Sequence, residues 1–201
     1  MRVLELFSGT GSVSKVCEEL GYEVISVDIS DKYSTPTFKC SILDFDYRQY
    51  QVGHFDIIWA SPPCATFSHL QACWIGRGKT RESINQNIQN IGLPLLRKAE
   101  EIIEYLQPTY YFIENPQTGR MKEFITRPYY DVDYCKYSDW GYKKRTRVWT
   151  NKIDFSNLLC RKDCDNMNDN RTKHNGDVSR VSSLKNKYRV PPQLIKDLIT
   201  V

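Results

Sequence analysis

Short apolar runs alternate with amphipathic stretches through the first half of the chain. Strands are predicted by the apolar runs Arg2–Phe7, Glu23–Val27, Phe55–Ala60 and Tyr110–Ile113. Helices are predicted over Val13–Leu20, which Gly21 ends, and over Ile91–Leu106, where apolar residues recur at helical spacing. This alternation predicts an α/β fold with a mostly parallel central sheet and helices on both faces.

The C-terminal third has a different composition. Residues 157–186 are rich in Asn, Asp, Lys and Ser and lack a regular apolar period, which favours a loop or a small insert. A chain of 201 residues has the length of one domain. We therefore expect a single domain over 1–201, with a short basic insert at about 151–187.

The sequence indicates neither a membrane segment nor secretion. No apolar run approaches the roughly 20 residues that cross a bilayer, and the start, MRVLELFSGTG, lacks the features of a signal peptide. We expect an intracellular protein without a membrane partner, in the bacterial cytoplasm or, if the protein is viral, in the host cell.

Positive charge gathers toward the end of the chain. The net charge of +4 permits a polyanionic partner without requiring one. The clustered basic residues are Lys143, Lys144, Arg145, Arg147, Arg161, Lys162, Arg171, Lys173, Arg180, Lys185, Lys187 and Arg189. Such a cluster either forms a solvated face or contacts phosphates.

Two sequence features at the ends of predicted strands favour a nucleoside ligand. The turn Ser8–Ser12, with the sequence SGTGS, follows the first strand, and its glycines allow a tight turn and a close approach to a ligand. No Lys-Ser or Lys-Thr follows, so a phosphate-binding P-loop is not predicted. Asp28 ends the second strand, where an acid can bind ribose hydroxyls.

Two further strand exits hold a cysteine and a glutamate. The segment Ala60–Ser68, ASPPCATFS, leaves its strand through two prolines, which fix the backbone before Cys64. Glu114 closes the strand before Pro116 in the same way. Because ligands bind beyond the carboxyl ends of parallel strands, we interpret Cys64 as a nucleophile and Glu114 as its acid partner.

The chain resembles the DNA cytosine-5 methyltransferases, whose motifs occur in the same order. The matching segments are Leu4–Gly11, Asp28, Pro62–Ser68, Glu114–Asn115, Lys143–Arg147 and Val190–Leu194. Four positions depart from the family pattern: Asp28 stands for a glutamate, Ser41 for an acid, Pro116 for a valine and Lys143 for a glutamine. The resemblance implies a Rossmann-like methyltransferase fold and S-adenosyl-L-methionine as cofactor.

The resemblance also implies roles for individual residues. Cys64 would add to C6 of cytosine, Glu114 would hold N3 and the amino group, and Arg145 or Arg147 would bind the base carbonyl and a phosphate. The cofactor would be bound by Phe7, Ser8, Gly9, Thr10, Gly11, Asp28, Ile29, Ile42 and Pro62.

The largest departure from the family concerns target recognition. Only Thr150–Arg189 lies where the family carries a long recognition region. Three explanations stay open: a very short DNA target, a separate specificity protein, or a substrate that is RNA or a free nucleotide. We favour duplex DNA with the base flipped out of the stack, and we expect a role in restriction–modification. The nucleic acid would be contacted by Ser68, Arg77, Lys79, Arg81, Lys143 and Lys144.

Two other functions fit part of the pattern. Ser61–Cys64 is similar to the Ser-Pro-Pro-aromatic motif of enzymes that methylate exocyclic amino groups, but a cysteine stands at the aromatic position. A non-catalytic module that binds cofactor or nucleic acid would account for the altered motifs. Binding alone, however, needs neither Cys64 nor Glu114.

The 7 cysteines are an odd number, and without a secretion signal most are expected to be free thiols. Cys160, Cys164 and His174 offer three soft metal ligands, but the sequence shows no fourth ligand at a regular spacing, so no metal site is predicted. Cys17, Cys40, Cys73 and Cys135 are interpreted as core or near-surface thiols.

Overall fold

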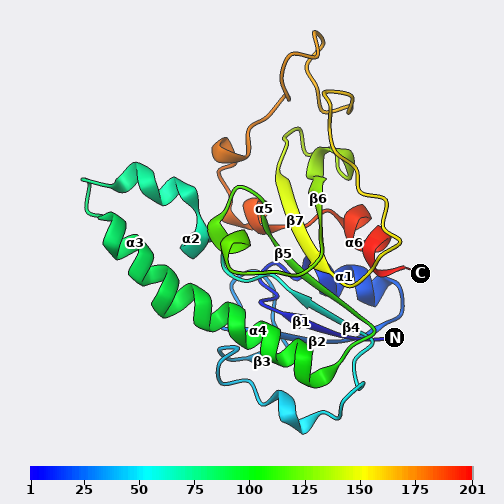
Figure 1. Ribbon diagram of the computed structural model, residues 1–201. Coiled ribbons are helices and arrows are strands. Elements are labelled where there is room, and N and C mark those ends of the chain that lie inside the picture. The colour runs from blue at the N-terminus through cyan, green and yellow to red at the C-terminus, as the bar shows by residue number, and fades with distance from the viewer. Residues whose placement is uncertain (201) are drawn as a thin grey trace.

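A seven-stranded sheet forms the centre of the computed structural model, which describes residues 1–200 (Figure 1). The strand order is β3-β2-β1-β4-β5-β7-β6. The strands are β1 Arg2–Leu6, β2 Glu23–Asp28, β3 Phe38–Lys39, β4 Ile57–Ala60, β5 Tyr110–Pro116, β6 Tyr129–Asp133 and β7 Arg145–Thr150. The first five are parallel, whereas β7 is antiparallel to both β5 and β6. The predicted α/β class with a mostly parallel sheet is confirmed.

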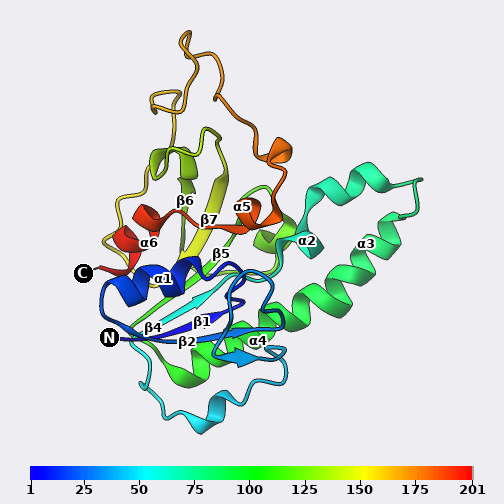
Figure 2. The same cartoon turned by 180° about the vertical axis from the view of Figure 1, so that it is seen from behind.

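Helices cover both faces of the sheet. The helices are α1 Ser12–Glu19, α2 Cys64–Phe67, α3 Arg81–Asn87, α4 Leu93–Leu106, α5 Leu184–Tyr188 and α6 Pro192–Ile199. Helices α1 and α6 lie together on one face and α4 lies on the other (Figures 1 and 2). Neighbouring β1 residues point to opposite faces, so Val3 packs with α1 and α6 while Leu4 packs with α4.

The strands and helices predicted up to residue 113 are found with ends shifted by one to three residues. The apolar pattern predicted neither the β6–β7 hairpin nor α3. In β7, Arg145 and Arg147 alternate with the buried Thr146 and Val148, because the arginine side chains pair with aspartates of β6 rather than with the core. Between α3 and α4 the helix passes through a π-helical turn, Ile88–Gly92, so the helical segment is longer than its apolar pattern.

Two segments project from the sheet (Figure 1). Residues 68–87 form an arm that leaves the sheet after α2 and returns through α3. Residues 151–187, coloured yellow to orange, extend beyond β6 and β7 with little regular secondary structure. The division into one domain with a short insert stays a prediction. Within residues 1–200, none of the helices is both long and apolar enough to span a membrane.

Helix α6 is held by burial of its apolar face, which gives a test of the fold. We predict that Leu194→Ala, at a side chain that is 0% exposed, lowers the free energy of unfolding by about 2–5 kcal/mol through lost contacts and a cavity. Ile153→Ala, at a side chain that is 83% exposed, should change it by no more than about 0.5 kcal/mol. Urea denaturation of both variants measures the difference, and equal effects would contradict this packing.

Candidate active site

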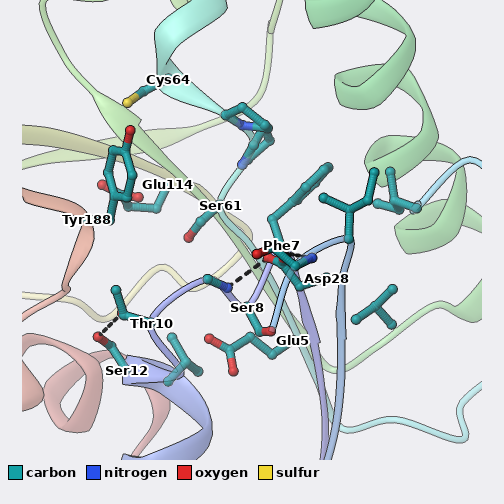
Figure 3. A pocket seen from close by; sticks show the side chains of 18 of the residues that line it. Glu5, Phe7, Ser8, Thr10, Ser12, Asp28, Ser61, Cys64, Glu114 and Tyr188 are labelled. Atoms are coloured by element: carbon teal, nitrogen blue, oxygen red, sulfur yellow. Dashed lines mark hydrogen bonds between the residues drawn. The ribbon is translucent and has the colours of Figure 1, made fainter. Parts of the chain in front are cut away.

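A cavity of about 370 Å³ lies at the carboxyl ends of β1, β2, β4 and β5 (Figure 3). Its wall includes Glu5, Phe7 and Ser8 from the first strand and turn, and Cys64 and Glu114 from later strand exits. The volume falls in the range of pockets that hold cofactors and other small ligands. The parallel sheet therefore brings together segments that are more than a hundred residues apart in sequence.

The turn after β1 is shaped for close approach. Phe7 has a φ of 59°, an uncommon conformation for an aromatic residue, and its ring lines the cavity. The N–H of Gly9 donates to Asp28 Oδ2 at 2.8 Å, which ties the turn to the end of β2. Gly11 has a φ of 66°, and a Cβ there would lie 2.5 Å from Ser34 Oγ.

The β2 end of the cavity offers an apolar surface beside a carboxylate. Ile29 is 73% exposed although it is a large aliphatic residue, and it lines the cavity together with the buried Ile42. Asp28 Oδ1 accepts from the Ser30 N–H at 2.8 Å. A flat apolar ring can pack between these side chains while hydroxyl groups approach the carboxylate.

The backbone before Cys64 is clamped from the neighbouring strand. Asn115 is buried, and its Nδ2 donates to the Pro62 carbonyl at 2.8 Å. On the other side, a Cβ at Gly92 would lie 2.8 Å from Phe67 Cζ, so the π-helical turn packs directly against α2. Cys64, the first residue of α2, is therefore fixed at the cavity wall.

Opposing effects act on the Cys64 thiol, and the net result is a raised pKa. Burial raises its pKa above the ordinary value, and the Glu114 carboxyl raises the pKa further. The Lys144 ammonium opposes both by lowering the pKa. Lys144 lines the cavity, lies 4.7 Å from the centre of the Tyr134 ring and donates to the Lys187 carbonyl at 3.2 Å. It is thus the basic group that favours the nucleophilic thiolate.

Glu114 is buried and held by a tyrosine. Its Oε1 accepts from the Tyr134 hydroxyl at 3.0 Å, and its side chain is 6% exposed. Burial and the neighbouring carboxyl raise the pKa of Tyr134 well above its ordinary value, so this phenol stays a hydrogen-bond donor. The carboxyl group of Glu114 is thereby oriented on the wall that it shares with Cys64 (Figure 3).

Arg145 and Arg147 are engaged elsewhere. Arg145 binds both oxygens of Asp133 at 2.9 and 2.7 Å, and Arg147 binds both oxygens of Asp131 at 2.7 and 2.9 Å. The register pairs Arg147 with Asn115, the residue after Glu114, so both arginines stand on the strand face opposite Glu114. Neither arginine lines the cavity.

A comparison with protein families matches residues 1–152 to the C-5 cytosine-specific DNA methylases. A relative from Frog virus 3 (isolate Goorha), named "Probable DNA (cytosine-5)-methyltransferase", is 44% identical over 215 residues. That match covers 99% of this chain and 99% of the relative.

The chain belongs to the C-5 cytosine-specific DNA methylase family. This membership makes it a cytosine-5 DNA methyltransferase and assigns S-adenosyl-L-methionine as its cofactor. The resemblance inferred from the motifs is confirmed.

Two solved methyltransferases are also similar in structure. Entamoeba histolytica EhMeth shares 16% identity with a TM-score of 0.49, and the match covers 80% of this chain and 55% of that one. A mutant of Spodoptera frugiperda DNMT2 shares 17% identity with a TM-score of 0.46 over 80% of this chain and 53% of that one. This methylase thus spans about half the length of those chains.

The cavity fits the cofactor assigned to this methylase. S-adenosyl-L-methionine carries a positive sulfonium, and the charged groups that line the cavity are the carboxyls of Glu5, Asp28 and Glu114 and the ammonium of Lys144. The buried Ser8 Oγ has no protein partner among the described residues and lines the same cavity. Most cofactor positions expected from the motifs line it, namely Phe7, Ser8, Gly9, Thr10, Asp28, Ile29, Ile42 and Pro62. Gly11 instead shapes the turn behind them.

The residues expected to bind nucleic acid are separated by the structure. Ser68, Arg77, Lys79 and Arg81 belong to the projecting arm at 68–87, where Lys79 Nζ donates to Gln71 Oε1 at 2.8 Å. Lys143 binds Asp133 Oδ2 at 3.3 Å. Lys144 alone of this set lines the cavity.

Several residues that line the cavity were given no role from the sequence, among them Glu5, Ser61 and Tyr188. Glu5 lies within the first motif, and its place at the end of a strand was a signal that could have identified it. Tyr188 comes from α5, close to the end of the chain, and no sequence pattern connects it with Cys64. Its position depends on how the C-terminal segment folds back over the sheet.

The protonation of Glu5 gives a prediction about stability. Burial raises its pKa to about 7, and the hydrogen bonds that it accepts from Ser14 only partly oppose this. Because the folded state retains the proton longer than the unfolded state, this group's contribution to stability is complete below pH 4.5 and is lost as pH rises to about 7. The loss amounts to about 3 kcal/mol.

We predict that Glu5→Gln flattens the fall in unfolding free energy across this interval, since glutamine cannot ionise. Urea denaturation at several pH values measures it, with exposed Glu18→Gln as the matched control. An unchanged pH slope in Glu5→Gln would contradict the assignment.

The position of Lys144 gives a prediction about thiol reactivity. Loss of its ammonium should raise the pKa of Cys64 further, so Lys144→Gln should move the alkylation of Cys64 by iodoacetamide to higher pH. The rate is followed on the Cys64 peptide by mass spectrometry. Exposed Lys15→Gln removes the same charge outside the cavity and should leave the profile unchanged; identical profiles for all three proteins would overturn the role of Lys144.

Proposed function

We propose that Cys64 is the nucleophile that adds to C6 of a cytosine in DNA, and that Glu114 is its acid partner. The observation that carries this assignment is that both side chains lie on one cavity wall, within the pocket that the glycine turn and Asp28 also line. A non-catalytic module would need neither a clamped thiol nor a buried carboxyl held by a tyrosine.

In this reaction the Cys64 thiolate adds to C6 while Glu114 holds N3 and the amino group of the base. The bond to C6 makes C5 nucleophilic, and the bound cofactor supplies the methyl group that C5 takes. A base then removes the C5 proton, the C5–C6 double bond re-forms and Cys64 leaves as a thiolate. Lys144 stabilises the thiolate before attack and after release.

Lys144, rather than Arg145 or Arg147, is the basic residue that we assign to the base pocket. Lys144 directly precedes β7 and is four residues before Val148, the residue that pairs with Glu114, so along extended backbone it lies on the same face of the sheet as Glu114. The two arginines hold β6 to β7 through bidentate aspartate pairs and thereby keep Tyr134 in contact with Glu114. Their proposed role is to position the acid, not to bind the base.

The substrate that we propose is duplex DNA with the target base flipped out. Cys64 lies in a cavity, which a base within a stacked duplex cannot enter. Exposed Arg77 and Arg81 on the arm, and exposed Arg161 and Arg171 on the insert, project from the same protein and can contact phosphates.

The recognition region of this chain is short, because only about 151–187 is available for it. A very short target sequence accounts for that length, and a separate specificity protein is the alternative. The Frog virus 3 relative supports a viral setting in a host cell. A role of this protein in a restriction–modification system stays a prediction.

The decisive experiment traps the covalent adduct. We predict that labelled cofactor and duplex DNA containing 5-fluorocytosine give a labelled protein–DNA band, because fluorine at C5 blocks the final proton removal. Cys64→Ser should give no band, and Glu114→Gln should slow its formation by about 10²–10⁴-fold. Exposed Cys73→Ser should behave as the unmodified protein.

Calorimetric binding of S-adenosyl-L-methionine by each variant separates loss of chemistry from loss of fold. A band that persists in Cys64→Ser would overturn the assignment of the nucleophile. A band with RNA of the same sequence, and none with duplex DNA, would overturn the assignment of the substrate.

A further inference from the structure

A second cluster of reactive side chains lies outside the active site. Cys135, Cys160, Cys164 and His174 each offer one ligand atom, and these four atoms all lie within 4.8 Å of one another. Three segments contribute them: the turn after β6, the first part of the insert, and a later strand-like part of it. The fourth ligand that was missing from the sequence pattern is Cys135, which is 25 residues or more from the others in sequence but adjacent in space.

The spacing of these atoms is that of a tetrahedral metal site. Cys160 Sγ and Cys164 Sγ are 3.6 Å apart, and His174 Nε2 lies 3.5 and 3.4 Å from them. Tetrahedral zinc with ordinary bond lengths separates two sulfurs by about 3.8 Å and a sulfur from a nitrogen by about 3.6 Å. A disulfide would bring the two sulfurs to about 2.05 Å, so these sulfurs are not bonded to each other, and Cys135 Sγ completes the group within 4.8 Å of the other three atoms.

Within the described residues, the buried apolar side chains of the insert are Phe155, which packs with one face of the sheet, and those gathered at this cluster. The three cysteines are buried with Met167 in a group that is separate from both faces of the sheet. Residues 151–177 contain no helix or extended strand. A segment of this kind buries too little apolar surface to hold one conformation, and a structural metal is a common solution.

Hydrogen bonds around the cluster orient its ligands. Asn166 Nδ2 donates to the carbonyls of Cys135 and Ser138 at 2.9 and 2.7 Å, which joins the insert to the turn after β6. The Cys160 N–H donates to Asp133 Oδ2 at 2.8 Å. An antiparallel bridge between Met167 and His174 places the imidazole against the cysteines. Supporting bonds of this kind accompany metal ligands in proteins.

Two lysines lie beside the cluster. Zn²⁺ with three thiolates and a neutral imidazole carries one net negative charge. Lys143 Nζ lies 3.4 Å from the Cys160 carbonyl oxygen, and Lys136 Nζ lies 3.2 Å from Asp163 Oδ2, beside Cys164 in sequence. Each ammonium is also paired with a carboxylate, Lys143 with Asp133 and Lys136 with Asp163, so neither occupies a ligand position.

We propose that Cys135, Cys160, Cys164 and His174 bind one structural Zn²⁺. On binding, three thiol protons are released to solvent and three Zn–S bonds and one Zn–N bond form, which leaves no open position for a substrate. The site fastens the insert to the end of β6, one residue from Tyr134, which holds Glu114, and beside Asp133, which binds Arg145. Sulfur and imidazole ligands favour zinc over magnesium or calcium.

The first test is the metal content of the full chain, purified under reducing conditions after expression with added zinc. Inductively coupled plasma mass spectrometry should find one zinc per chain. Replacement by Co²⁺ should give the visible absorption of tetrahedral cobalt with thiolate ligands. Absence of zinc with all thiols reduced, or iron in its place, would overturn the proposal.

Variants distinguish a site from chance binding. Cys160→Ser and His174→Ala should lower zinc affinity by more than about 100-fold, whereas His174→Cys, which restores four ligands, should retain one zinc per chain. Cys73→Ser, at an exposed thiol outside the cluster, should bind zinc normally. Equal zinc binding by His174→Ala and His174→Cys would overturn the assignment of His174, and full stoichiometry in both Cys160→Ser and His174→Ala would overturn the site.

Discussion

The hydrogen bond from the Asn115 amide to the Pro62 carbonyl is the contact on which the active site depends. It joins the exits of β4 and β5, and therefore sets where the Cys64 thiol stands relative to Glu114. Prolines 62 and 63 stiffen that exit but cannot donate a backbone hydrogen bond, so an external group must hold it. A buried amide does so at little entropic cost, because Asn115 lies within a strand that is itself fixed by the sheet.

Strands β6 and β7 are held together by ion pairs. Asp131 and Asp133 bind Arg147 and Arg145 on one face, while Tyr134 and Val148 pack on the other face with the core that surrounds Trp59. Asp133 also accepts the Cys160 N–H, so the same carboxylate connects the arginine strand to the insert. The tyrosine that holds the active-site acid, the two aspartate–arginine pairs and one member of the cysteine cluster, Cys135, thus all lie on or directly beside the β6–β7 hairpin.

Much of the candidate site follows from local sequence. The glycine turn, Asp28, Cys64 and Glu114 each stand at the end of an apolar run, and the carboxyl ends of parallel strands meet at one edge of a sheet. Once strand and helix alternation indicates such a sheet, their proximity is expected. The direction in which Arg145 and Arg147 point could not be expected from the sequence. A motif does not show which side chains lie on the neighbouring strand, and β6 has no apolar pattern that would have identified it as the strand that carries the aspartates.

The sequence by itself determined the order of the elements, the parallel sheet and the identity of the residues at its edge, since period and turn chemistry are properties of neighbours along the chain. Only the tertiary structure decided that Lys144 faces Cys64, that Tyr188 closes the same cavity, and that Cys135 meets Cys160, Cys164 and His174. Each of these contacts joins segments that are far apart in the sequence, with no regular spacing that would indicate the contact. Their distance depends on how the hairpin and the C-terminal segment fold back, which no local pattern encodes.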